Sequence, residues 1–251
     1  MLAGWRTGPD ELVLVRHGES VGNLADAEAR ENQADRLDLS ARDADVELTD
    51  LGLRQADGVG RWLERTEEES RPELVLSSPY RRAAETARRA VQGLGLEIEY
   101  DERLRERDLG LFDGLTWQGI RAEYPDEADR RDKLGKFYYQ PPSGESWCDV
   151  ALRVRSLMAD LSRGYDGARV WMFAHQAVIM SFRYVLEALD EERLLELDRT
   201  TKLPNASMSV FQRIDDRWKL DRWADTSAVD DIDAEVTREA PQSGRGDDAG
   251  A

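Results

Sequence analysis

The stretch Leu12-Val13-Leu14-Val15-Arg16-His17-Gly18-Glu19-Ser20 decides the fold of this chain. Its apolar first half predicts a buried strand over residues 11–15, and the polar and small residues that follow end that strand abruptly. In layered α/β folds, ligands gather just outside the carboxyl ends of the strands. Arg16 and His17 are therefore candidate site residues at the rim of a sheet.

A second histidine stands in the same context. The run Val170-Trp171-Met172-Phe173-Ala174 predicts another strand, and His175 follows it directly. These are the only two histidines in the 251 residues. Because the carboxyl ends of parallel strands meet at one rim, we expect the two imidazoles to lie close together.

Strands and helices alternate along the rest of the chain. We expect further strands at 73–76 and 96–100, a terminal hairpin at 207–213 and 218–222, and helices beginning near Thr49 and covering 80–91, 150–161 and 177–189. This order predicts an α/β fold: a three-layer α/β/α arrangement with a mostly parallel central sheet, helices on both faces and a lid insertion.

In two segments the apolar residues do not recur at helical or strand spacing. Residues 24–47 are polar and are interpreted as a mobile insertion, and residues 101–142 are long enough to form the lid over a site. We expect one catalytic domain over residues 1–226. The acidic residues 227–251 are expected to form a disordered tail.

The net charge of −17 disfavours a nucleic-acid partner, since nucleic-acid surfaces select basic footprints. No apolar run reaches membrane-spanning length, so we expect a soluble, cytoplasmic protein with no membrane partner. The single Cys148 cannot form an internal disulfide. An anionic substrate would require arginines to converge in a locally positive pocket.

Residues 16–23 carry the strongest chemical signal. After His17 the small residues Gly18 and Ser20 allow a ligand to approach the backbone, whose amides can hold phosphate oxygens, and Asn23 adds a neutral donor. An imidazole placed there can act as a nucleophile on phosphorus. The segment Arg-His-Gly-Glu-Ser, followed by Asn, resembles the signature of the histidine phosphatase superfamily, which includes the cofactor-dependent phosphoglycerate mutases.

The resemblance continues in order along residues 12–213. Further similar segments begin at Leu48-Thr49-Asp50, Ser77-Ser78-Pro79, Glu102-Arg103-Leu104, Pro142-Ser143-Gly144 and Asn205-Ala206-Ser207. It implies that Arg16 and Arg82 clamp a phosphate, that His175 adds a third donor, and that Glu106 is the proton donor. Asn23, Thr49 and Gln176 are the implied substrate-binding residues, and a role in shaping the loop is the alternative for Asn23 and Thr49. Arg103 and Arg107 are open candidates for contact with substrate.

Gln176 departs from the common pattern, because many members have glycine after the second histidine. The sequence His175-Gln176-Ala177-Val178 resembles the phosphatase half of the bifunctional fructose-2,6-bisphosphate enzymes. It leaves the substrate class open.

We therefore expect a metal-independent phosphatase that hydrolyses a small phosphomonoester through a phosphohistidine on His17. A phosphoglycerate mutase-type transfer and a non-catalytic phosphoryl-ligand-binding protein are the alternatives. No cofactor is expected, because the chain lacks zinc-ligand spacings, a phosphate loop and a dinucleotide fingerprint. The oligomeric state and the natural substrate stay open.

Overall fold

The computed structural model describes residues 7–230. Six strands form one sheet in the order β3-β2-β4-β1-β5-β6. Strands β3 (Glu99–Tyr100), β2 (Leu74–Ser77), β4 (Arg169–Ala174) and β1 (Glu11–Arg16) are parallel, whereas β5 (Met208–Ile214) and β6 (Arg217–Asp225) are antiparallel to their neighbours. The expected α/β class with a mostly parallel sheet is confirmed.

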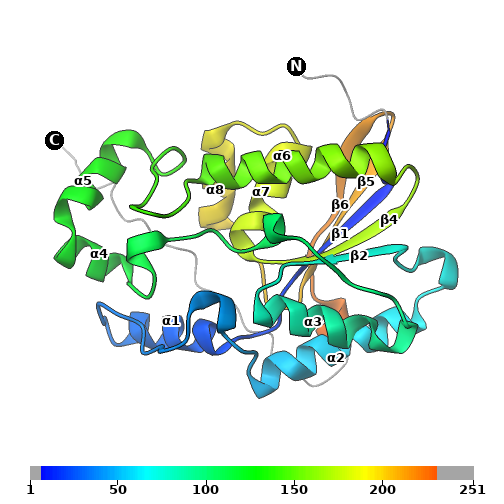
Figure 1. Cartoon of the computed structure of the whole chain (residues 1–251), viewed down its shortest axis with the longest axis horizontal. Coiled ribbons are helices and arrows are strands. Elements are labelled where there is room, and N and C mark those ends of the chain that lie inside the picture. The colour runs from blue at the N-terminus through cyan, green and yellow to red at the C-terminus, as the bar shows by residue number, and fades with distance from the viewer. Residues whose placement is uncertain (1–6, 231–251) are drawn as a thin grey trace.

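Helices cover both faces of the sheet (Figure 1). Successive residues of β1 point to opposite faces: Leu12 and Leu14 join a core with α6 (Trp147–Gly164) and α7 (Gln176–Leu186), and Val13 and Val15 join a second core with α2 (Asp50–Arg65) and α3 (Arg81–Val91). The buried strands are thus apolar on both sides. This explains the continuous apolar runs in the sequence.

The remaining helices lie around the carboxyl end of the sheet or pack on its helices. They are α1 (Val21–Glu31), α4 (Trp117–Glu123), α5 (Pro125–Leu134), α8 (Glu191–Thr200) and α9 (Ser227–Asp230), with single 3₁₀ turns at Asp43–Asp45, Glu68–Ser70, Gln92–Leu94, Glu102–Leu104 and Gly110–Phe112. In Figure 1, α1, α4 and α5 lie together on one side of the molecule.

Two expectations need correction, and one helix was not expected. The third strand is two residues long instead of spanning 96–100, because only Glu99 and Tyr100 pair with β2. Leu96 and Ile98 pack partly against the helix-covered core instead. The first part of the segment 24–47 is not an irregular insertion: it continues α1, whose Ala25 and Ala29 are buried. No pattern in the sequence had indicated α8.

The carboxyl-terminal boundary also differs from expectation. Ser227–Asp230 are helical, and Ala228 and Val229 are buried in the core beside α2. The domain therefore extends at least four residues beyond 226. Residues 231–251, the rest of the expected tail, lie outside the described residues, so that part of the prediction stays a prediction.

Within residues 7–230, no helix combines the length and apolar character that crossing a bilayer demands.

Candidate active site

The register between β1 and β4 brings the two histidines together. Arg16 pairs with Ala174 across the parallel ladder, so the next residues, His17 and His175, leave the sheet side by side. Their ring centroids are 5.1 Å apart. Both side chains are buried, with 3% and 0% of their surface exposed. The expected meeting of the two imidazoles at the rim is what the structure shows.

Hydrogen bonds fix the orientation of the His17 ring. Nδ1 lies 2.7 Å from the carbonyl oxygen of Gly18, which can only accept, so Nδ1 carries the proton and donates it. The same geometry leaves Nε2 unprotonated in the neutral ring. The backbone is held as well, because Asn205 Nδ2 donates to the His17 carbonyl at 3.0 Å. His17 thus presents Nε2 as its free lone pair.

Close packing of the loop explains the glycine after His17. The Gly18 amide donates to Thr86 Oγ1 at 3.0 Å. A Cβ on Gly18 would lie 2.5 Å from the carbonyl oxygen of Gly52, and one on Gly52 would lie 1.9 Å from the carbonyl oxygen of Glu19. Only glycine at both positions lets the loop cross the start of α2 at this separation.

Two buried arginines flank the histidines. Arg16 is 2% exposed and donates from Nη1 to the Leu203 carbonyl at 2.5 Å. Arg82, on the first turn of α3, is 5% exposed, and its Nη1 binds Asp43 through the carbonyl oxygen at 2.6 Å and through Oδ1 at 2.9 Å. The local positive charge that an anionic substrate requires is therefore present inside an acidic protein.

Burial and these arginines control the charge of both imidazoles. Burial lowers the pKa of His17 well below its ordinary value, and repulsion from Arg82 and Arg16 lowers it further. The pKa of His175 is lowered well below its usual value by burial and then by Arg82 and His17. Both rings are consequently neutral at neutral pH, the form in which a ring nitrogen has a lone pair.

His175 lies behind His17 instead of in the cavity wall. Its Nε2 is 2.8 Å from Ser78 Oγ, which also accepts from the Tyr80 amide at 3.2 Å. Among residues 7–230, His175 Nδ1 is buried without a hydrogen-bond partner. The Tyr80 ring meets the His175 ring edge-on at 5.4 Å.

Glu106 approaches the site from the lid segment. Its Oε1 accepts from the Arg107 amide at 2.8 Å. Burial raises the pKa of the Glu106 carboxyl, against the lowering effects of this hydrogen bond and of the Arg82 charge, and the nearby Asp43 adds to the rise. A carboxyl group with these surroundings holds its proton to a higher pH than an exposed glutamate does.

A partly buried ion-pair network holds the backbone that carries Glu106. Glu145 Oε1 accepts from Arg105 Nη2 at 2.7 Å and from Arg153 Nε at 3.0 Å, and its Oε2 accepts from the Asp108 amide at 3.1 Å. Arg153 Nη2 donates to the Glu106 carbonyl at 3.3 Å. The segment has little regular structure of its own, so these side chains fix its path.

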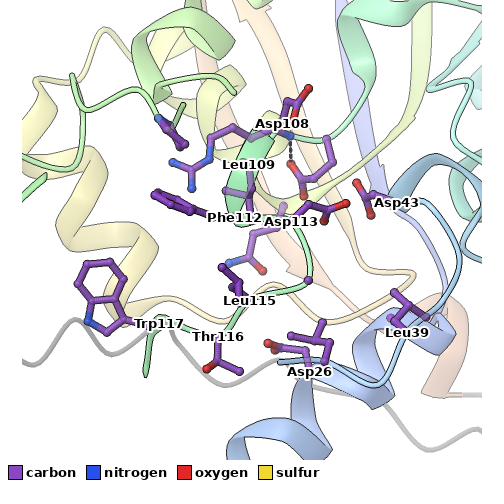
Figure 2. Close-up of a pocket in the computed structure, with 18 of the residues that line it drawn as sticks. Asp26, Leu39, Asp43, Asp108, Leu109, Phe112, Asp113, Leu115, Thr116 and Trp117 are labelled. Carbon is purple, nitrogen blue, oxygen red and sulfur yellow. Dashed lines mark hydrogen bonds between the residues drawn. The ribbon is translucent and has the colours of Figure 1, made fainter. Parts of the chain in front are cut away.

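A cavity of about 880 Å³ joins these groups. Its wall contains six of the expected site residues: Arg16, His17, Asn23, Arg82, Glu106 and Gln176. Figure 2 shows part of the wall, in which the carboxylates of Asp43 and Asp113 face one another. Burial raises the pKa of the Asp113 carboxyl, and the Asp43 charge raises it further. The lid segment contributes much of the remaining wall.

Thr49 and Asn23 have structural contacts. Thr49 is not in the cavity wall; its hydroxyl donates to Glu19 Oε1 at 2.7 Å and accepts from the Gly52 amide, which begins α2. Asn23 lies in the wall, but its Oδ1 accepts from the Ser20 amide at 3.0 Å and from Asn205 Nδ2 at 3.2 Å. Both residues shape the loop around His17.

The structure also decides between the two open arginines and adds residues that the sequence did not indicate. Arg103 pairs with Asp101 and Asp160 away from the cavity, whereas Arg107 lines it. Cavity residues missed by sequence reasoning include Asp43, Trp117, Arg131, Lys136, Trp147 and Asp198.

Within residues 7–230, no group of three or more His, Cys, Asp or Glu side chains is arranged to hold a metal ion.

Known proteins resemble this chain along most of its length. The model of the histidine phosphatase superfamily (branch 1) matches residues 12–226. A metal-independent phosphoserine phosphatase of Arabidopsis thaliana is 28% identical over 223 residues, covering 88% of this chain and 84% of the relative. A 2,3-bisphosphoglycerate-dependent phosphoglycerate mutase of Methylorubrum extorquens is 31% identical over 198 residues, covering 77% and 86%.

A solved structure shares the whole fold. The complex of a mycobacterial glucosyl-3-phosphoglycerate phosphatase with inorganic phosphate matches with a TM-score of 0.69 at 30% identity, covering 88% of this chain and 99% of that one.

Proposed function

This chain belongs to the histidine phosphatase superfamily, and from that premise we propose that it hydrolyses a small phosphomonoester, without a metal ion, through a phosphohistidine on His17. That it is a phosphatase follows from the family and from its phosphatase relatives. The covalent intermediate, the residue roles and the substrate are the parts proposed.

The observation that carries the proposal is the fixed His17 ring. Its Nδ1–H donates to Gly18, and its lowered pKa keeps Nε2 unprotonated, so the nucleophilic nitrogen needs no separate base. Attack forms the Nε2–phosphorus bond and breaks the bond from phosphorus to the leaving oxygen. The phosphoryl group then stays on His17 until water displaces it.

Arg16 and Arg82 supply the positive charge that phosphoryl transfer requires. Charge spreads over the equatorial oxygens in the transition state, and positioned cations stabilise it. A guanidinium can contact two such oxygens at once. Asp43 pairs with Nη1 of the Arg82 guanidinium in this structure. Substrate binding would replace this ion pair with a contact between Arg82 and the phosphate.

His175 is assigned a donor role. Ser78 Oγ accepts from the Tyr80 amide and lies 2.8 Å from His175 Nε2. We assign the hydroxyl proton to this contact and the ring proton to Nδ1. This nitrogen has no partner among residues 7–230. Its N–H supports a contact with a phosphoryl oxygen brought beside His17.

Glu106 serves as acid and then as base. Its raised pKa supports the protonated form, which gives its proton to the departing alkoxide. The resulting carboxylate then takes a proton from the attacking water, and the products are inorganic phosphate, free His17 and protonated Glu106. Charge and protons balance over the cycle.

A phosphatase assay in excess chelator tests the proposal. We expect release of inorganic phosphate from p-nitrophenyl phosphate and from alkyl phosphates. The rate should fall by at least about 10³ in His17→Ala, because the covalent nucleophile is lost. Equal rates in the folded variant and in the native protein would contradict the proposal.

The mutase relative supports one second candidate, transfer of the phosphoryl group back to a phosphoglycerate. Both activities share the first half-reaction. Incubation with 3-phosphoglycerate separates them, since a phosphatase releases inorganic phosphate and a mutase forms the 2-phospho isomer.

A further inference from the structure

The cavity has a second positively charged end, formed by Arg107, Arg131 and Lys136. All three line the same cavity as His17, and none takes part in the proposed reaction. The side chains of Arg131 and Lys136 are 21% and 19% exposed. Cations that are this far removed from water are uncommon unless an anion compensates their charge.

Aromatic rings hold these cations in place. The guanidinium of Arg107 lies 5.5 Å from the centroid of the Trp147 ring, and Lys136 Nζ lies 5.6 Å from the same centroid. Arg131 lies 4.3 Å over the Trp117 ring. Rings attract cations through their faces but do not neutralise them.

Carboxylates compensate the cluster only in part. Lys136 Nζ binds Asp198 Oδ2 at 2.7 Å, and the Asp198 side chain is 4% exposed. The carboxylate nearest to Arg131 is the exposed Asp132, at 3.7 Å, and Glu127 in the cavity wall instead accepts from the Tyr139 hydroxyl.

Arg107 has even less compensation. Across residues 7–230 its guanidinium makes no hydrogen bond, although Glu106 and Asp198 are near enough to act on its charge. Burial lowers the pKa of all three basic groups. Arg107 and Arg131 further lower the pKa of Lys136 by repulsion.

The cluster lies across the cavity from the phosphate clamp. Asp43 marks the clamp because it binds Arg82, and Trp117 marks the cluster because Arg131 stacks on it. In Figure 2, Asp43 and Trp117 are at opposite sides of the view. A small molecule with its phosphate at His17 would therefore extend its leaving group toward Arg107, Arg131 and Lys136.

We propose that this cluster binds a second anionic group, a carboxylate or a second phosphate, on the leaving group of the substrate. The inference rests on the proposed phosphatase function and narrows it to phosphomonoesters of small acids. Charge-assisted hydrogen bonds in a partly buried site are the strong ones, so the second anion is a main source of specificity.

Matched substrate pairs test the proposal. 3-Phosphoglycerate and glycerol 3-phosphate differ in a carboxylate, and the bisphosphate and monophosphate of propane-1,3-diol differ in a phosphate. We expect kcat/KM to favour the more anionic member of at least one pair by about 10- to 100-fold. The pair that shows the preference identifies the anion.

Substitutions in the cluster test whether it causes the preference for the more anionic substrate. Arg131→Gln should reduce it about tenfold or more and change the rate on p-nitrophenyl phosphate by less than about threefold. Lys136→Gln combined with Asp198→Asn should do the same without leaving a buried charge unpaired. Arg130→Gln, at an exposed neighbour on the same helix, is the matched control and should change nothing.

Calorimetric titration of the His17→Ala protein with the same pairs measures binding apart from catalysis. Tighter binding of the more anionic members, lost in the added Arg131→Gln variant, supports the proposal. Equal binding within both pairs, or an equal loss for both members of a pair, overturns it. Absence of p-nitrophenyl phosphate turnover alone would instead count against the phosphatase function.

Discussion

The His17 imidazole and the Glu106 carboxyl are both shielded from water, and shielding shifts their pKa values in opposite directions. The lowered pKa of His17 keeps its imidazole neutral as pH falls, as the proposed nucleophile requires. The raised pKa of Glu106 keeps its carboxyl protonated as pH rises, as the proposed acid requires. Activity should therefore decline at low pH, where His17 becomes protonated, and at high pH, where Glu106 loses its proton.

The upper side of this profile tests the role of Glu106. With an alkyl phosphate, the rate should fall as pH rises through the raised pKa, and Glu106→Gln should lower the rate by about 10²–10⁴. With p-nitrophenyl phosphate the loss should be less than about tenfold, because nitrophenolate departs without a proton. Similar losses on both substrates would show that Glu106 is not the acid.

Individual residues were predictable where a short local pattern names them. His17, His175, Arg16 and Arg82 each follow a strand or begin a helix, and the structure gathers them at one rim. Thr49 was recognised as part of a pattern, but its hydroxyl caps α2 and binds Glu19 outside the cavity.

Other cavity residues were not predictable. Arg131 and Lys136 stand among many charged residues of the lid segment, and only the tertiary path turns them inward.

At the scale of elements, the position of Glu106 depends on a segment with little regular structure. Glu145 and Arg153, with side chains 14% and 10% exposed, tie residues 103–108 to α6 through paired charges and backbone contacts. Loops that carry catalytic groups need such external support, because small displacements of a proton donor lower rates strongly.

Removal of this support should affect proton donation more than phosphate binding. Glu145→Gln should lower kcat on alkyl phosphates about tenfold or more and leave the rate on p-nitrophenyl phosphate within about threefold. Unfolding measurements should show up to about 3 kcal/mol of lost stability from the broken pair. Arg163→Gln, in an exposed ion pair near the end of α6, is the control. A uniform rate loss would indicate a structural role only.

Elements were predictable where apolar periodicity is strong. Strands β1 and β4 and helices α6 and α7 agree with expectation within a few residues, because their core faces are large and apolar. Helix α1 buries only alanines, so its pattern resembles that of a polar loop. Helices α4 and α5 lie over the cavity rather than on the sheet, and each buries a single small residue, Gly119 and Ala128, which leaves no apolar stripe to detect.

At the scale of the molecule, the net charge of −17 repels an anionic substrate, so binding a phosphate ester conflicts with the overall charge of the protein. The two positively charged ends of one cavity resolve this conflict, since buried charges act more strongly at short range than the screened surface field. The three-layer fold contributes by placing the ends of β1 and β4 at the floor of that cavity.

Inorganic phosphate should therefore stabilise the folded protein despite its charge. At about 100 times its dissociation constant, mass action predicts a gain of about 2.7 kcal/mol. For a chain of this size that gain corresponds to a rise in Tm of roughly 5–10 °C. Thermal unfolding of the native protein and of Arg82→Gln measures it. A rise that persists unchanged in Arg82→Gln would place phosphate elsewhere.

The most direct test of the central claim is to trap the intermediate. Native protein, His17→Ala and His175→Ala are mixed with a substrate labelled in its phosphoryl group, quenched in base within one turnover, and digested for peptide mapping. We expect an acid-labile label on Nε2 of His17, absent from His17→Ala. A turning-over enzyme without label on residue 17, or with the label on His175, would contradict the account.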